Sequence, residues 1–384
     1  MPNPQEVAEL ILGSLVFQDW ESVWVQHRWQ QGWPTFRFAS TEGSVPLDYR
    51  KLQFKPGDPC EILLGGQLAV VGIITNRQVA YTATEKGIQL SGVGKQWAAV
   101  TSSVPMEGDK PNFDKMTVVQ GFSKAATQVG GKPFIIGNLD TQPFERFQAH
   151  PGEKTWDLMD RMARMREASI GSDHLGNILL IGEHTSPITA TLVEGENILK
   201  MQCVFSNEQM YSEYYLTGQF SVSDDKTMQK AAQVRAKASG TMQEVYRRLE
   251  IPSENQDTNQ QRRATYEALQ ADGTQIVANV TVQGWLRDGV NLWRTGDLVI
   301  IKSPMCPLNL GMKIQTATFA QDSRAGTTTL LECVLPWKLG DKQYGAGNPS
   351  KDQPKAPEPA KDDTVPKPAT PAPATPAPPV QGLE

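Results

Sequence analysis

The chain has 384 residues, a formal net charge of −5, 39% hydrophobic residues and 21% charged residues. These values are typical of a soluble globular protein with two or three domains, and the weak negative charge excludes a chain built as a whole to grip nucleic-acid phosphates. No window approaches 18 uninterrupted apolar residues, and the apolar run at 7–15 lacks the basic region and cleavage site of a signal peptide. We therefore expect a protein that is made and kept in a cytoplasm, or delivered by a route other than secretion.

Residues 1–100 predict a first β-barrel. Apolar and polar side chains alternate from Val23 to Trp29, and further short apolar runs are separated by glycine-containing turns. Short runs broken by glycine at regular spacing favour a closed or nearly closed antiparallel barrel. The later strands expected here are 36–38, 61–64, 69–75, 79–84 and 88–93.

Residues 101–185 predict a mixed α/β domain. Apolar residues at helical spacing predict a helix over 116–129 that stops at Gly130. A second helix is expected over 155–170, with Thr155 as its N-cap, acidic residues near its start and arginines near its end. Residues 177–181 are expected to form a buried strand.

Residues 186–340 predict a second β-barrel with a polar, partly mobile insertion at about 223–260. Within that insertion, 228–249 has a ragged helical pattern, and 260–270 predicts a helix. The strands expected in this part are 189–193, 199–205, 211–222, 275–283, 298–302, 313–319 and 327–335.

Residues 341–384 predict a disordered tail. The segment consists mainly of Pro, Ala, Lys, Asp and Thr and has almost no large apolar side chain, so it cannot bury enough surface to offset the entropy of ordering. We expect an extended chain of polyproline character. It is either a passive tail or a tether for a neighbouring protein.

A self-match at an offset of 239 residues indicates an internal repeat. A Gly-Asp pair before a strand and two later turn or bulge glycines recur in one ungapped register, which predicts two copies of one small barrel separated by the α/β segment. The fold class is therefore mainly β with α+β insertions. The matched residues are Gly57, Asp58, Gly72 and Gly87 in the first copy and Gly296, Asp297, Gly311 and Gly326 in the second.

Two similar barrels in one chain have a geometric use. A trimer of such chains presents six barrels in a ring of approximate six-fold symmetry. Such a ring could connect a six-fold tube to a three-fold spike.

The C-terminal half resembles the baseplate hub proteins of tailed phages, especially those of Mu-like phages. The residues that carry the resemblance are Arg263 to Glu267, Gly284-Trp285, Leu292 to Val299 and the closing strand with Gly326 and Leu330-Leu331. The order of elements matches over about 15–337, but only about 260–337 is motif-like. The Pro/Ala-rich tail departs from the family.

The resemblance implies a structural virion protein with no catalytic residues. The expected assembly is a homotrimeric ring in the tail tip or baseplate, put together in the host cytoplasm. Its partners would be the tail tube or a distal tail protein on one face, a separate central spike on the other, and the tape measure protein. DNA would pass through the channel without specific binding.

The residue pattern gives little support for a catalytic, cofactor or metal site. The cysteines lack metal-site spacing and are expected to be buried or half-buried thiols, and no carboxylate or cysteine completes a metal set around the scattered histidines. We expect no cofactor, no metal and no hydrolase carboxylate pair. One alternative remains open: residues 150–159 resemble the start of a peptidoglycan-binding LysM repeat, which would make the chain a cell-wall-binding module of a tail tip or secretion spike. The cysteines are Cys60, Cys203, Cys306 and Cys333, and the histidines are His27, His150, His174 and His184.

Overall fold

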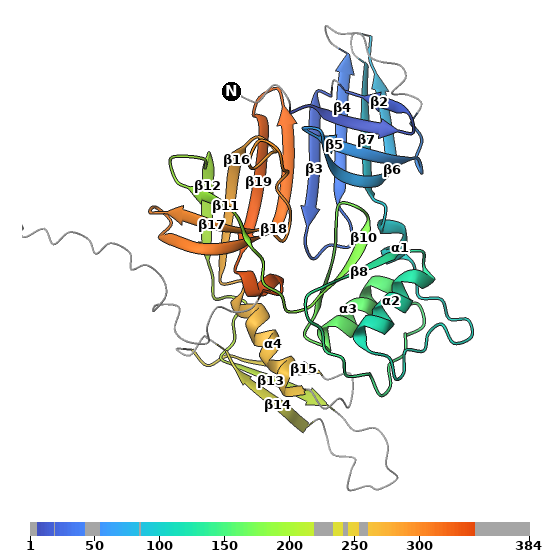
Figure 1. Ribbon diagram of the computed structural model, residues 1–384, viewed down its shortest axis with the longest axis vertical. Coiled ribbons are helices and arrows are strands. Elements are labelled where there is room, and N and C mark those ends of the chain that lie inside the picture. Colours follow the sequence, from blue (N-terminus) through green and yellow to red (C-terminus); the bar gives the residue numbers. More distant parts are fainter. Residues whose placement is uncertain are drawn as a thin grey trace, which may run out of the picture. The chain divides into compact units, whose positions relative to one another are not determined.

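A computed structural model describes residues 6–18, 20–42, 54–83, 86–218, 233–240, 245–252 and 260–341. The described chain is mainly β, which confirms the expected class. Most strands join one 13-stranded sheet, and two three-stranded sheets accompany it (Figure 1). The expected disordered tail lies outside the described residues, except for Asp341.

The first half of the large sheet runs in the order β3-β4-β7-β6-β5-β1-β2. Alternating buried and half-buried residues along β3 and β7 fit a sheet with one face on a core. The two strands expected at 69–75 and 79–84 are replaced, over the described residues, by one continuous 15-residue strand. The strands are β1 (Ala8–Leu12), β2 (Leu15–Phe17), β3 (Ser22–Arg28), β4 (Thr35–Glu42), β5 (Pro59–Leu64), β6 (Gln67–Tyr81) and β7 (Lys86–Gly94).

The second half repeats this order. It runs β12-β16-β19-β18-β17, with β11 outside β17, so five strands correspond one to one with β3-β4-β7-β6-β5. The long central strands β6 and β18 both have 15 residues, and β7 and β19 both have 9. The strands are β11 (Ile188–Val193), β12 (Lys200–Phe205), β16 (Ile276–Gln283), β17 (Leu298–Ser303), β18 (Leu308–Asp322) and β19 (Gly326–Val334).

The expectation of two separate closed barrels is wrong for the described residues. Closure of the first half would need β3 to return to its own β5 or β6, but β3 pairs antiparallel with β18 of the second half. Each long strand also changes partner midway, at a bulge between Ile74 and Asn76 in β6 and between Ile314 and Thr316 in β18. The two halves therefore share one sheet.

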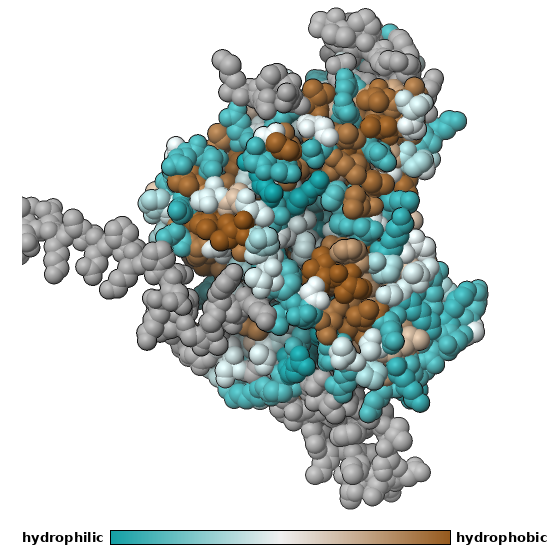
Figure 2. Space-filling model, in the orientation of Figure 1, coloured by the Kyte–Doolittle hydropathy of each residue, from teal (hydrophilic) through white to brown (hydrophobic). Residues whose placement is uncertain are grey.

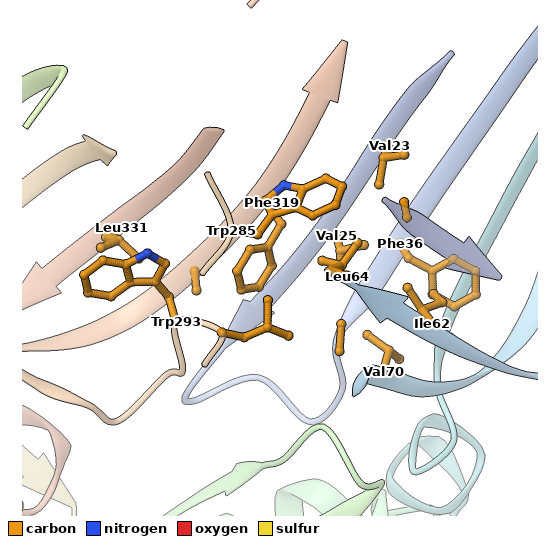
Figure 3. Packing of buried hydrophobic residues seen from close by; sticks show 14 of the residues in the cluster. Val23, Val25, Phe36, Ile62, Leu64, Val70, Trp285, Trp293, Phe319 and Leu331 are labelled. Carbon is orange, nitrogen blue, oxygen red and sulfur yellow. The ribbon is translucent and has the colours of Figure 1, made fainter. Parts of the chain in front are cut away.

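One hydrophobic core runs under both halves. Figure 3 shows its side chains in sequence from Leu331 and Trp293, past Phe319, to Val25 and Phe36. All five are buried, and they belong to a single cluster of contacting side chains. Burial of apolar surface from both halves in one core couples their stability.

The α/β unit has a separate core. A capping box begins α2, because the Thr117 hydroxyl accepts from the Gln120 N–H and the Gln120 side chain accepts from the Thr117 N–H. Three strands pair in the order β8-β10-β9. The elements are α1 (Trp97–Thr101), α2 (Val118–Gln128), β8 (Lys132–Ile136), α3 (Thr155–Arg164), β9 (Ser169–Ser172) and β10 (Asn177–Ile181).

Helix α3 differs from its prediction at both ends. Its N-cap position is Lys154, and the Thr155 hydroxyl instead donates to the carbonyl of Ser102 at 2.9 Å. The helix ends at Arg164, six residues early, because Glu167 adopts a left-handed φ of +56° and the chain then enters β9. The predicted helix over 116–129 and the predicted strand over 177–181 are confirmed.

The expected insertion is partly described and contains strands. The helical pattern over 228–249 is wrong where the structure describes it, because 233–239 and 248–252 pair with β13 in a third sheet. Helix α4 starts where predicted. The elements are β13 (Glu213–Gly218), β14 (Gln233–Ser239), β15 (Arg248–Pro252), α4 (Gln260–Asp272) and a 3-10 turn, η2 (Pro336–Leu339).

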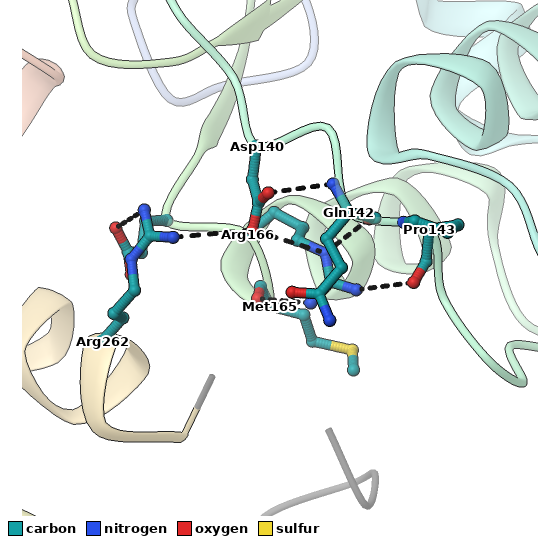
Figure 4. Close-up of polar contacts among 7 residues, drawn as sticks. Asp140, Gln142, Pro143, Met165, Arg166 and Arg262 are labelled. Carbon is teal, nitrogen blue, oxygen red and sulfur yellow. Dashed lines mark hydrogen bonds and ion pairs between the residues drawn. The ribbon is translucent and has the colours of Figure 1, made fainter. Parts of the chain in front are cut away.

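Ion pairs attach α4 to the α/β unit (Figure 4). Arg262 lies 3.7 Å from Asp140 and 2.9 Å from Glu167. Next to them, the buried Arg166 guanidinium donates to the carbonyl of Gln142 at 3.3 Å. A buried guanidinium needs such acceptors, so this cluster fixes the chain after α3.

Candidate assembly interface

A tight Gly-Asp turn leads into β5. Gly57 has a φ of +99°, a region that favours glycine. Its N–H donates to the carbonyl of Ile74 at 2.7 Å, and the Ile74 N–H donates to the carbonyl of Asp58 at 3.0 Å. The Asp58 carboxylate accepts from the Lys55 N–H at 2.8 Å. The turn thus attaches the start of β5 to the bulge of β6.

The turn before β17 has the same hydrogen bonds. Gly296 has a φ of +86°, and its N–H donates to the carbonyl of Ile314 at 2.8 Å. The Ile314 N–H donates to the Asp297 carbonyl at 3.0 Å, and the Asp297 carboxylate accepts from the Arg294 N–H at 3.3 Å. Ile74 and Ile314 therefore hold equivalent places on the two long strands.

The glycines on the long strands are offset from each other by one residue. Gly72 pairs with Cys60 on β5. Val299 stands at the place of Cys60 in the second half, and it pairs with Met312 rather than Gly311. A longer hairpin between β17 and β18 accounts for this shift.

The hairpin between β18 and β19 adds a second one-residue shift to the alignment of the two sheet halves. Gly92 pairs with Ile74, just before the β6 bulge. Cys333 pairs with Ile314, just before the β18 bulge. When Gly92 is aligned with Cys333, Gly87 corresponds to Thr328 and not to Gly326. Gly326 has a φ of +70° and forms the turn into β19. The repeat therefore extends through β19, but with a small insertion at each hairpin.

The two halves meet at a seam, defined here as β3 paired with residues 316–321 of β18. Val25 lies directly opposite Phe319, and both side chains are buried. Next to them, the Gln26 side chain donates to the Thr318 hydroxyl at 2.9 Å. Apolar contact on one face and a hydrogen bond on the other fix the register of the seam.

Residues 76–81 of β6 and strand β12 hold the places that correspond to the two sides of the seam. Residues 76–81 of β6 pair with β7, and residues 316–321 of β18 pair with both β19 and β3. Strand β12 pairs only with β16, whereas its counterpart β3 pairs with β4 and β18. Val79, Tyr81 and Phe205 on these edges are 47%, 83% and 54% exposed. No local motif marks either edge, so sequence reasoning missed both.

Exposed apolar side chains are not confined to one region. Figure 2 shows them on the drawn face as separate brown patches among polar residues. Unpaired strand edges that carry apolar side chains are surfaces that favour association with another strand.

A half-buried arginine lies near the seam. The Arg294 guanidinium donates to the carbonyl of Leu68 on β6 at 2.8 Å, which links the two halves. Burial, together with the Arg294 charge, lowers the pKa of His27 to about 3 and that of His174 to about 4. Both imidazoles are therefore neutral at pH 7.

A buried lysine connects β18 to the end of the described chain. The Lys313 Nζ lies 2.8 Å from His184 Nε2 and 3.2 Å from a carboxylate oxygen of Asp341. Burial lowers the pKa of Lys313, and the Asp341 charge opposes that shift. The indole of Trp29, just after β3, lies 5.4 Å from the same Nζ.

The cysteines and the acidic residues form no metal or catalytic site in the described part of the chain. Cys60 and Cys333 are buried and Cys203 and Cys306 are half-buried, all as free thiols. Burial raises the pKa of Cys60 to about 12 and that of Cys203 to about 11. The described residues contain no group of three His, Cys, Asp or Glu that could hold a metal ion. They also contain no helix long and apolar enough to cross a membrane.

The segment that resembles a LysM repeat shares its core with residues outside it. Leu158 and Met162 of α3 belong to the same buried cluster as Phe113 and Phe122. Strand β10 also pairs with β8, which precedes residue 140. The described structure therefore places this segment within a larger α/β unit.

Comparisons with known proteins relate this fold to tail proteins. No family model matches the chain, and no curated protein matches it. Among solved structures, the 43 kDa tail protein of prophage MuSo2 from Shewanella oneidensis is 21% identical, with a TM-score of 0.71 over 87% of this chain and 99% of that one. The tail protein from Neisseria meningitidis MC58 is 17% identical, with a TM-score of 0.71 over 88% of this chain and 99% of that one.

A more distant likeness extends to a secretion system. The E. coli c3393 protein is described as a type VI secretion component similar to the T4 tail proteins gp27 and gp5. It is 9% identical, with a TM-score of 0.50 over 85% of this chain and 76% of that one. The chain thus has the fold of phage tail and baseplate-spike proteins.

Proposed function

We propose that the chain is a non-enzymatic structural subunit of a phage tail, and that it forms a hub between the tail tube and the central spike. The fold that it shares with prophage tail proteins supports a place in the virion. Fold alone does not determine function, so the proposal depends on the geometry of the described surfaces.

The observation that carries the hub proposal is the duplicated sheet half. Each chain supplies two five-strand units in the same strand order. Three chains would therefore supply six units around one axis, and the ring would have three-fold symmetry and approximate six-fold symmetry. Such a ring meets a six-fold tube on one face and a three-fold spike on the other.

The proposed partners follow from this position. The tail tube or a distal tail protein would bind one face, a separate spike protein the other, and the tape measure protein would contact the channel. DNA would pass through without specific binding, which agrees with the net charge of −5.

Light scattering of the purified chain across a concentration series tests this proposal, alone and with the spike protein. The expected mass is three times 42.3 kDa. Negative-stain images should then show a ring with six similar lobes. A monomer under every condition would contradict the hub, and a monomer that sediments with purified peptidoglycan would favour the cell-wall-binding alternative.

A further inference from the structure

We propose that Cys203 and Cys306 form a dithiol site, which a low-molecular-weight disulfide such as oxidised glutathione converts into a disulfide bond within one chain. The bond would join β12 to the turn between β17 and β18. Because β12 ends the strand order of the second half on one side and β17 lies near its other side, the bond would link the two sides of that half.

Hydrogen bonds hold the turn after β17 against the connection between β11 and β12. The Glu194 N–H donates to the carbonyl of Lys302 at 2.9 Å. The Glu194 carboxylate accepts from the Ser303 hydroxyl and from the Met305 N–H, the latter at 3.1 Å. The Ser303 hydroxyl in turn accepts from the Cys306 N–H at 3.2 Å. Cys306 therefore lies in a turn that contacts the residue just after β11.

Strand β12 runs in the same direction as β17. Four antiparallel pairings separate the two strands in the sheet, and an even number of reversals restores the direction. Strand β11 is parallel to β17, and only residues 194–199 connect it to β12. Strand β12 therefore continues in the direction of β11, toward the side of the sheet half where the turn with Cys306 lies.

Both thiols lie on the inner side of the sheet. Cys203 contacts the large core, whereas its neighbours Gln202 and Val204 are exposed, and Cys306 contacts the same core from the turn. Burial, followed by the charge of a Cys306 thiolate, raises the pKa of Cys203, as expected for two neighbouring sulfurs. Both thiols are free and half-buried, so a small disulfide can reach them.

The chemistry is an exchange between thiols and a disulfide. One thiolate of the pair attacks a sulfur of oxidised glutathione, which breaks that S–S bond, forms a mixed disulfide and releases one reduced glutathione. The second thiolate then attacks the protein sulfur of the mixed disulfide and releases the other glutathione. Two protons and two electrons thus pass from the cysteines to two glutathione molecules. Cys60 and Cys333 are buried and should take no part.

The surroundings of the chain would determine when the bond forms. Thiols stay reduced in a cytoplasm, whereas disulfides persist outside it. This timing rests on the proposed function, in which the subunit would be assembled with free thiols and linked after release. The bond would close a loop of about 100 residues, which restricts the unfolded chain and should make the linked form harder to unfold.

Thiol counting on the full chain gives the readout. The reduced protein is treated with oxidised glutathione, its remaining thiols are alkylated after denaturation, and its tryptic peptides are mapped by mass spectrometry without reduction. All four cysteines should be alkylated before oxidation, and only Cys60 and Cys333 afterwards. The peptides with Cys203 and Cys306 should appear as one linked species, and oxidation in urea should instead give several pairings. Four alkylated cysteines after oxidation, a link through Cys60 or Cys333, or a link between chains would overturn the proposal.

Single substitutions separate the bond from general effects of oxidation. Cys203→Ser and Cys306→Ser should form no internal link, and the variant that keeps the first thiol to react should retain a glutathione adduct. The matched control, Cys60→Ala, should form the link as wild type does. Oxidation should raise the unfolding temperature of wild type and Cys60→Ala by about 3 °C or more, and leave that of Cys306→Ser unchanged. Wild type that retains glutathione without forming the link would also overturn the proposal.

The bond and the hub can fail separately. Light scattering of the same samples gives the oligomeric state beside the thiol count. A monomer that forms the link would contradict the hub and support the dithiol site, whereas a trimer with four free thiols after oxidation would support the hub and overturn the site.

Discussion

Val25 of β3 lies directly opposite Phe319 of β18, and both side chains are buried in the core that extends under the two sheet halves. The two residues are far apart in the chain. Their contact makes each half depend on the other, because neither half closes on itself in the described structure.

Phe319→Ala should lower the free energy of unfolding by about 3–5 kcal/mol, because it leaves a cavity at the seam. Urea unfolding followed by circular dichroism should still show one transition for both halves. Leu330→Ala on the neighbouring strand is the control, since Leu330 is 43% exposed and should cost about 1 kcal/mol or less. Equal losses in the two variants would contradict the described packing of the seam.

The two Gly-Asp turns should respond differently to the same substitution. Gly57→Ala meets no atom within 4 Å and should cost about 1–2 kcal/mol from its positive φ alone. Gly296→Ala has similar backbone strain, but its Cβ would collide with the indole of Trp29. Thermal unfolding should therefore show a larger loss for Gly296→Ala. Equal losses would mean that Trp29 moves aside without cost.

His27 should make the fold sensitive to acid. Its pKa is about 3 when folded against an ordinary value of 6.5, so below pH 6.5 the unfolded chain takes up a proton that the folded chain does not. Stability from this group is complete above pH 6.5 and is lost as pH falls toward 3. Between pH 7 and 4, wild type should lose on the order of 3 kcal/mol more unfolding free energy than His27→Gln. The same slope in both proteins would exclude His27 as the cause.

The buried pair of Lys313 and Asp341 should show strong coupling in a double-mutant cycle. Asp341→Asn leaves the Lys313 charge buried beside a neutral partner and should cost about 3–5 kcal/mol. Lys313→Met combined with Asp341→Asn removes both charges and should cost less than Asp341→Asn alone. Denaturant unfolding of the four proteins measures the coupling. Additive losses would show that the two groups do not interact.

Local sequence patterns located most of the elements. The alternation around Val25 and the apolar spacing of α2 reflect burial of one face, which a single segment reveals on its own. Helix α3 was overestimated because its pattern continues to Ile170, whereas the left-handed Glu167 ends it for reasons that lie in the packing of β9.

The joining of the two halves could not be predicted in the same way. Every outer strand of a duplicated sheet carries the same alternation, so the sequence of β3 does not distinguish its own β6 from β18 as a partner. The repeat was visible from Gly57 and Gly296, but a fixed offset misses the residues that each hairpin of the second half adds.

The seam also gives the sheet a direction. The strand order ends with β12 on one side and β2 on the other, and these are different surfaces. A contact between them cannot be two-fold symmetric, so each chain that joins leaves the same edge open for the next. Growth of such a polymer ends only when the last chain meets the first, and a chain in which β12 alone is blocked would stop it at one end.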